Sequence, residues 1–83
     1  SSMTREEIVK ITNQFLVDEI EIDETVLKEE ASLKDDLGID SLDFVDIVVI
    51  VEKNFGFKIK AEEMGGVTTL GAFYDYIEKK VNA

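Results

Sequence analysis

The chain has 83 residues, of which 45% are hydrophobic, and it carries a net charge of −10 at neutral pH. This size and composition fit one globular domain with a modest core rather than a disordered segment. The chain contains no proline, cysteine or histidine, which excludes disulfides, thiolate metal ligands and the usual general base of neutral-pH catalysis. We expect residues 3–83 to form a single domain, and Ser1 and Ser2, which precede Met3, to be a cloning remnant.

The first predicted element is a helix over residues 5–17. Thr4 and Glu7 have the spacing of a capping box, in which each side chain bonds to the other residue's backbone N–H. Hydrophobic side chains then recur at helical spacing, at Ile8, Ile11 and Phe15. This pattern predicts an amphipathic helix with its apolar stripe in the core.

Residues 18–39 are less regular. The segment at 17–23 reads VDEIEID, an alternation that is compatible with a short edge strand. A connection of this length in so small a domain is usually functional or wrongly assigned. We expect Gly38 to adopt a positive φ, and four hydrophobic side chains to hold the connection against the core: Val26, Leu33, Leu37 and Ile39.

The next segment, residues 40–57, reads DSLDFVDIVVIVEKNFGF. Its many β-branched residues are typical of strands, so residue propensity alone does not decide between strand and helix. Asp40 or Ser41 is a suitable N-cap, and Gly56 is a suitable residue to follow the last turn. The intervening run is too long for an ordinary strand. We therefore predict a helix over residues 41–55.

The last third of the chain predicts an extended link, one helical turn at residues 61–64 and a final helix that begins after Thr68 or Thr69. The apolar residues of the final helix recur at helical spacing, at Leu70, Phe73, Ile77 and Val81. Its last turn contains Lys79 and Lys80, where the helix dipole favours cations. The predicted fold class is all-α: a small four-helix bundle with three main helices, one short helix and a long first loop.

The negative charge is concentrated in one part of the sequence. Twelve acidic and two basic residues lie between Asp18 and Asp46, whereas the rest of the chain has seven of each. This concentration of negative charge disfavours binding to nucleic acid and anionic membranes and favours binding to partners with basic patches. An ordinary solubilising surface is the alternative. We expect no membrane span and no secretion signal, and therefore a cytoplasmic protein.

Ser41 lies within this acidic segment, but the sequence does not predict a hydrolase. A serine nucleophile needs a base, and histidine is absent. A lysine base would have to be desolvated, whereas the nearby Lys34 is followed by two carboxylates, Asp35 and Asp36. The neighbouring carboxylates do not match a calcium loop, although weak electrostatic cation binding stays open. We predict no catalytic residue and no metal site; on local grounds Ser41 is a helix cap.

The segment at residues 31–64 reads ASLKDDLGIDSLDFVDIVVIVEKNFGFKIKAEEM. It resembles the acyl carrier proteins, in particular the freestanding carriers of type II fatty acid and polyketide-like synthesis. DLGIDSLD, residues 36–43, is similar to the family's modification motif, and a weaker likeness extends over residues 4–81. The resemblance implies a non-catalytic carrier of acyl thioesters. A separate phosphopantetheinyl transferase would attach 4′-phosphopantetheine from coenzyme A to Ser41, with Asp40 and Leu42 on either side.

The resemblance also implies transient partners with basic docking patches: the transferase, a ketosynthase, an acyltransferase and reductase-type enzymes. The carrier itself is expected to be a monomer. Partner contacts are expected from Asp40, Leu42, Asp43, Phe44, Val45, Asp46, Val49 and Glu52. Family members often fold the acyl chain into a core cleft, for which the candidates here are Val45, Val49, Ile59, Ala61 and Met64.

Some residues depart from the family pattern. Lys53 and Asn54 interrupt the acidic face of the second long helix, and Phe44 replaces a residue that is usually small or polar. These departures leave open a carrier for a specialised acyl product, or less typically for an aminoacyl group. The alternative from another class is an acidic helical adaptor that binds a basic protein without a cofactor.

Overall fold

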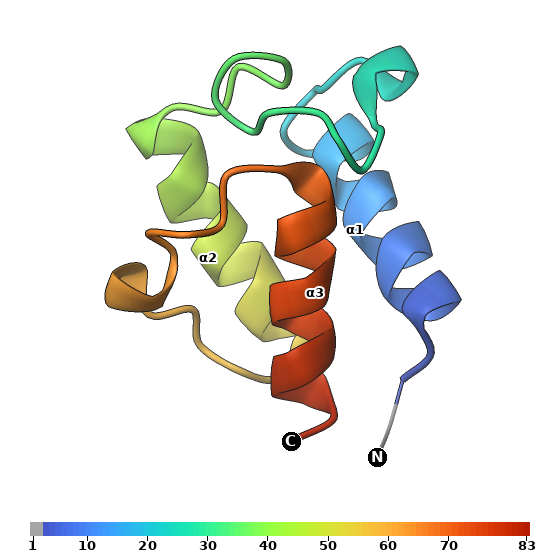
Figure 1. Ribbon diagram of the computed structural model, residues 1–83, viewed down its shortest axis with the longest axis vertical. Coiled ribbons are helices and arrows are strands. Elements are labelled where there is room, and N and C mark those ends of the chain that lie inside the picture. Colours follow the sequence, from blue (N-terminus) through green and yellow to red (C-terminus); the bar gives the residue numbers. More distant parts are fainter. Residues whose placement is uncertain (1–2) are drawn as a thin grey trace.

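The computed structural model describes residues 3–83, so the predicted cloning remnant at residues 1–2 lies outside the described part. Within it the chain forms three α-helices and two short 3₁₀ turns. The helices are α1 (Arg5–Asp18), α2 (Ser41–Phe55) and α3 (Leu70–Val81), and the turns are Glu24–Val26 and Ala61–Glu63 (Figure 1). The all-α fold class is confirmed, with the short fourth helix reduced to the second of these turns.

All three helices begin at side chains that cap their free N–H groups. Thr4 and Glu7 form the predicted capping box of α1, and Thr69 accepts a hydrogen bond from the backbone N–H of Ala72 at the start of α3. At the other end of α2, Gly56 follows the last turn with φ of 78°, a left-handed conformation that glycine adopts without strain.

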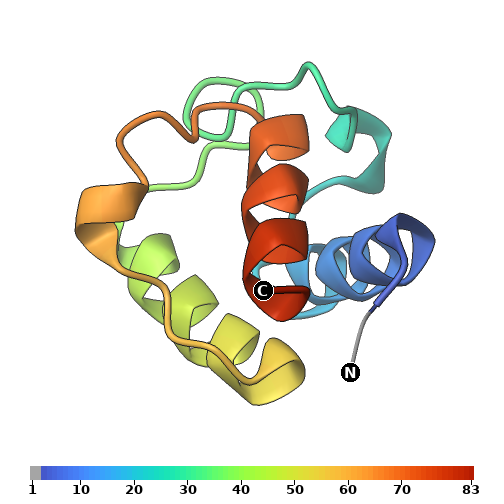
Figure 2. The same ribbon diagram turned by 60° about the horizontal axis from the view of Figure 1, so that its bottom comes forward.

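The hydrophobic core lies between the three helices. α1 and α3 pack directly against each other, and α2 lies to one side (Figure 2). Both strips of apolar residues predicted for α1 and α3 contribute to this core. Its buried hydrophobic residues are Ile8, Phe15, Leu16, Ala31, Leu37, Ile47, Ile50, Val51, Ile59, Leu70, Phe73, Tyr74 and Ile77.

The segment that resembled an edge strand is a loop, and that reading of the sequence is wrong. The backbone N–H groups of Ile20 and Ile22 donate to carbonyls of the last turns of α1, at 3.2 and 2.9 Å, and Glu21 has φ of 64°. This positive φ breaks the extended conformation that a strand requires. The alternation in sequence arises because both isoleucines fold back to pack against the core.

The rest of the long loop is held against the start of α3. Leu33 N–H donates to the carbonyl of Thr68, and Leu70 N–H donates to the carbonyl of Ala31, both at 2.9 Å. The four hydrophobic residues expected to anchor the loop all belong to the core or pack against it, and Leu37 is buried. Gly38 has the expected positive φ, 71°. The loop is therefore an ordered lid over one end of the bundle (Figure 1).

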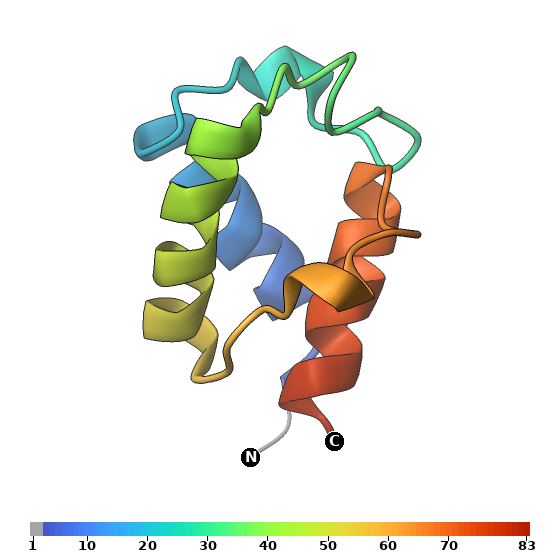
Figure 3. The same cartoon turned by 90° about the vertical axis from the view of Figure 1, so that its left-hand side faces the viewer.

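The second 3₁₀ turn is fastened to α3 by polar side chains. Tyr76 donates its hydroxyl proton to Glu63 at 2.7 Å, and the Lys80 ammonium lies 2.9 Å from the same carboxylate. In Figure 3 this turn crosses between the C-terminal half of α3 and α2. The hydrogen bond from Lys80, followed by that from Tyr76, lowers the pKa of Glu63.

This ion pair predicts a pH-dependent contribution to stability. Because the pKa of Glu63 is lower in the folded protein, its stabilising effect is present above the ordinary value of 4.5 and is lost as the pH falls through the folded value. Glu63→Gln should therefore be less stable than wild type at pH 7 and approach it at pH 3, as measured by urea unfolding at each pH. Glu62→Gln removes an equal charge from the neighbouring, exposed residue; an identical pH profile for the two variants would contradict the prediction.

One polar group in the core has no partner. The Thr12 side chain is fully buried, and its hydroxyl makes no hydrogen bond to any other group in residues 3–83. A buried, unsatisfied hydroxyl costs about 1–3 kcal/mol. Thr12→Val should raise the free energy of unfolding by about 1 kcal/mol, whereas Thr68→Val, at an exposed position, should change it by less than about 0.5 kcal/mol. Equal effects in chemical denaturation would show that the core hydroxyl carries no penalty.

Candidate functional site

The predicted attachment residue begins α2. Asp40 is the N-cap: its Oδ1 accepts the backbone N–H of Asp43 at 2.9 Å, and its carbonyl accepts that of Phe44 at 3.0 Å. The Asp43 carboxylate in turn accepts a longer bond, 3.4 Å, from the Asp40 N–H. Since the cap is Asp40 and not Ser41, the serine hydroxyl is not used to start the helix.

Ser41 is exposed as the first residue of α2, and its hydroxyl has no hydrogen-bond partner in the described part of the chain. The backbone N–H groups of Ser41 and Leu42 come before the first bonds of the helical ladder and are not taken by the cap. An accessible hydroxyl beside two free N–H donors fits a phosphodiester. The residues present therefore suit a group attached through a phosphate.

The loop before Ser41 is rigidly built. Ser32 organises it: its N–H donates to the Asp36 carboxylate at 2.7 Å, and its Oγ accepts the N–H of Asp35 at 3.0 Å. Ile39 N–H donates to the carbonyl of Leu33 at 3.0 Å, which ties the residue just before the cap to the loop. The serine is thus presented at a fixed place on the end of the bundle, in the start of α2 (Figure 1).

Beyond Ser41, α2 exposes an apolar strip to solvent. Leu42, Val45 and Val49 are 77%, 61% and 63% exposed, and they lie on one face because their spacings are three and four residues. We call Leu42, Val45, Asp46, Val49 and Glu52 the outer face of α2. Both carboxylates on it are exposed. Monomeric proteins rarely leave such a strip uncovered unless it meets a partner.

Two groups of the sequence-based site residues are placed differently from expectation. Phe44 is half-buried and packs against the core, so it is chiefly a core residue rather than part of the outer face. Of the cleft candidates, Val45, Val49 and Ala61 are exposed and do not line the core. Val45 and Val49 are exposed because they lie on the outer face of α2, and Ala61 is exposed as the first residue of the second 3₁₀ turn. Ile59 is buried, and Met64 packs against the core.

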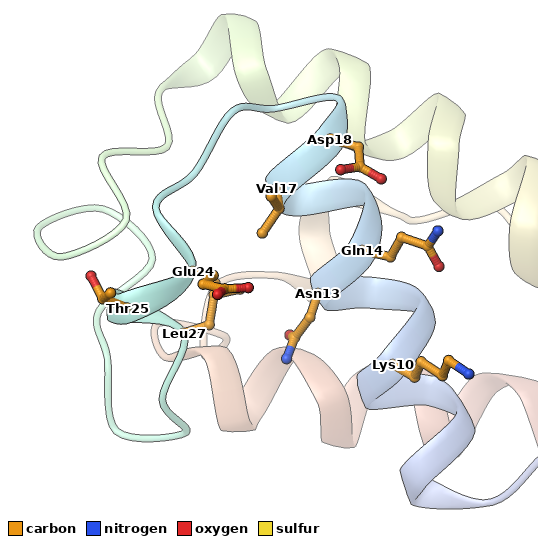
Figure 4. A pocket seen from close by; sticks show the side chains of 8 residues that line it. All are labelled: Lys10, Asn13, Gln14, Val17, Asp18, Glu24, Thr25 and Leu27. Carbon is orange, nitrogen blue, oxygen red and sulfur yellow. The ribbon is translucent and has the colours of Figure 1, made fainter.

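A surface hollow lies elsewhere, between α1 and the first 3₁₀ turn (Figure 4). It has a volume of about 680 Å³, and both polar and apolar groups line it: Lys10, Asn13, Gln14, Val17, Asp18, Glu24, Thr25 and Leu27. None of the predicted site residues lines it.

In residues 3–83 no three acidic side chains are grouped so as to hold a metal ion, and no helix is long and apolar enough to cross a membrane.

The comparison with known proteins agrees with the geometry of this site. The family model described as "Phosphopantetheine attachment site" matches residues 11–77, which include Ser41, the outer face of α2 and most of α3. The match defines the class of protein: a small helical domain that carries 4′-phosphopantetheine.

Two curated relatives are similar over nearly the whole chain. The acyl carrier protein of Thermotoga maritima is 41% identical over 78 residues, which are 94% of this chain and 96% of the relative. The acyl carrier protein of Rubrobacter xylanophilus is 37% identical over 75 residues, 90% of this chain and 93% of the relative. The chain belongs to the acyl carrier protein family, so its role is to carry acyl groups on the phosphopantetheine arm.

Proposed function

We propose that Ser41 is the residue to which phosphopantetheine is attached, and that residues 3–83 act as one carrier domain. The observation that carries this proposal is the exposed, unengaged hydroxyl at the first position of α2, inside the segment that the family model matches. Asp40 and Leu42 flank it. Asp40 fixes the start of the helix, and Leu42 leaves its side chain in solvent. Bound phosphopantetheine supplies a terminal thiol that holds the acyl group as a thioester.

We propose further that the protein is not an enzyme. A serine at this position has no histidine in the sequence to act as its base, so the base must come from another protein. A phosphopantetheinyl transferase fills that role: its base takes the proton of the Ser41 hydroxyl, the serine oxygen bonds to the phosphorus of the phosphopantetheine group, and the pyrophosphate bond of coenzyme A breaks to release adenosine 3′,5′-bisphosphate. The carrier contributes an accessible oxygen and a rigid loop rather than chemistry.

The outer face of α2 is proposed as the docking site for the transferase and for synthase-, acyltransferase- and reductase-type partners. Leu42, Val45 and Val49 offer apolar contact, and the carboxylates around them attract basic side chains. Each exposed ion pair contributes only about 0–1 kcal/mol. The summed charge therefore matters mostly for the rate of encounter, which suits a monomeric, cytoplasmic shuttle that visits several enzymes.

The experiment is to incubate the purified chain with coenzyme A and a broad-specificity phosphopantetheinyl transferase and to measure the intact mass. A gain of one phosphopantetheine is the expected result. An unmodified mass would favour the rival role of an acidic adaptor that binds a basic protein. Both relatives are named acyl rather than aminoacyl carriers, which favours an acyl group as the cargo.

A further inference from the structure

The first turn of α3 contains a glycine that its backbone conformation does not require. Gly71 is buried and lies within the regular helix, and its φ is not positive. Inside a helix, glycine is less favourable than every other residue except proline. Its presence at this position is therefore explained by its lack of a side chain rather than by its conformational freedom.

The space that a side chain would need at this position is occupied by the loop before Ser41. A Cβ atom at residue 71 would lie 3.0 Å from the carbonyl oxygen of Glu29 and 3.1 Å from its Cβ. Both distances are shorter than the 3.4–4 Å of ordinary van der Waals contact. The same close approach lets the Gly71 N–H donate to the Glu29 carbonyl at 2.8 Å. The glycine thus allows the loop to lie directly on the start of α3 (Figure 1).

Two more backbone hydrogen bonds continue this contact along the loop. Leu70 N–H donates to the carbonyl of Ala31, and Leu33 N–H donates to that of Thr68. Leu70 and Gly71 are the first residues of α3, and their N–H groups have no acceptor within the helix, so the loop carbonyls supply one for each. Because only backbone groups take part, these bonds fix the main chain of the loop.

The hydrogen bonds reach Ser41 through Leu33. The N–H of Leu33 is bonded to the segment that leads into α3, and its carbonyl accepts the N–H of Ile39 at 3.0 Å. Ile39 is followed directly by Asp40, the N-cap that fixes the first turn of α2. A shift of the loop away from α3 is therefore transmitted to the start of α2, where the Ser41 side chain is exposed.

We propose that Gly71 is a positioning residue for the attachment of phosphopantetheine: its missing side chain keeps the loop on α3 and so sets the place of the Ser41 hydroxyl. The proposal rests on Ser41 as the attachment site. The transferase has to bring the serine oxygen to the phosphorus of coenzyme A, and a small displacement of a reacting atom slows such a step strongly. Gly71 is buried in α3, so it acts on this step only through the loop.

The test is Gly71→Ala, with Gly66→Ala as the matched control. A Cβ atom at residue 66 would meet no other group within 4 Å, and Gly66 also has no positive φ. Loading is measured with saturating coenzyme A and a range of carrier concentrations. We expect Gly71→Ala to lower kcat several-fold with little change in KM, because the outer face of α2 is intact. Gly66→Ala should keep the wild-type kcat and KM.

The division between kcat and KM separates a positioning role from a loss of folded protein. If the alanine only unfolded part of the chain, the concentration of usable carrier would fall. The apparent KM would then rise, while kcat at saturating carrier would stay at the wild-type value. That result would overturn the proposal, and so would kinetics of Gly71→Ala that equal those of wild type.

A second measurement follows the backbone without using the reaction. In ¹⁵N-labelled protein, Gly71→Ala should shift the amide resonances of Leu33, Ile39 and Ser41, whereas Gly66→Ala should not. Shifts confined to residues 29–33 would show that the loop and Ser41 are not coupled, which would overturn the proposal. A wild-type chain that is not loaded on Ser41 would overturn the proposed function, whereas the amide shifts would still decide whether Gly71 is coupled to residue 41.

Discussion

Ser41→Ala should abolish loading with phosphopantetheine completely. The reason is chemical: the ester needs the Ser41 oxygen, and alanine offers none. The substitution should leave the fold intact, because the start of α2 is capped by Asp40 and not by the serine hydroxyl. Intact mass after incubation with coenzyme A and the transferase is the measurement, with circular dichroism to confirm the helical content.

Ser32→Ala is the matched control for this experiment. Ser32 also lies in the acidic segment, in the loop before α2, but its Oγ accepts a hydrogen bond from the backbone N–H of Asp35. We expect this variant to be loaded to the same extent as wild type, with a loss of stability of about 1 kcal/mol from the missing hydrogen bond. Phosphopantetheine found on the Ser41→Ala variant would move the attachment site to another residue.

Val51→Ala should destabilise the protein, whereas Val49→Ala should not, although the two valines are only two residues apart on α2. Val51 is fully buried, whereas Val49 is 63% exposed on the outer face. Truncating Val51 removes buried methyl groups and leaves a cavity, so it should cost about 2 kcal/mol. In a domain of this size that corresponds to a fall in melting temperature of roughly 8–16 °C.

Val49→Ala should change the stability by less than about 0.5 kcal/mol, as expected for an exposed position. Val49→Ala should instead weaken docking. The rate of phosphopantetheine loading at low transferase concentration should fall, while all of the protein is still loaded in the end. Thermal unfolding and loading kinetics on both variants make the comparison. If Val49→Ala destabilised the protein as much as Val51→Ala, the outer face of α2 would be part of the core and not a docking surface.

The contrast between these valines marks what the sequence could not decide. In VDIVVIV every residue but one is apolar, so periodicity identifies neither the buried face nor the exposed one. The prediction of a helix over residues 41–55 is confirmed to the residue, because caps and length do not depend on the pattern. Which valines face solvent depends on where α1 and α3 lie, and that is tertiary information.

In the long loop between α1 and α2, some features could be predicted from the sequence and others could not. The residues that anchor the loop were predictable, because Leu37 and its apolar neighbours can be buried only against the core. The positive φ of Gly38 was predictable too. The path was not predictable: Glu21 adopts a positive φ that its residue type disfavours, and the alternation of residues 17–23 suggested a strand instead. The reciprocal cap of Asp40 and Asp43 had a signal in the sequence, an acid three residues after the N-cap.

The two ends of the described chain lie next to each other, since Met3 and Asn82 exchange hydrogen bonds of 2.9 and 3.2 Å. They are at the opposite end of the bundle from the start of α2 (Figure 1). A linker, a solid support or a host protein joined at either residue would therefore leave the serine and the outer face of α2 unobstructed. The same closeness makes the domain suitable for insertion into a loop of another protein, or for circular permutation with new termini at an exposed turn.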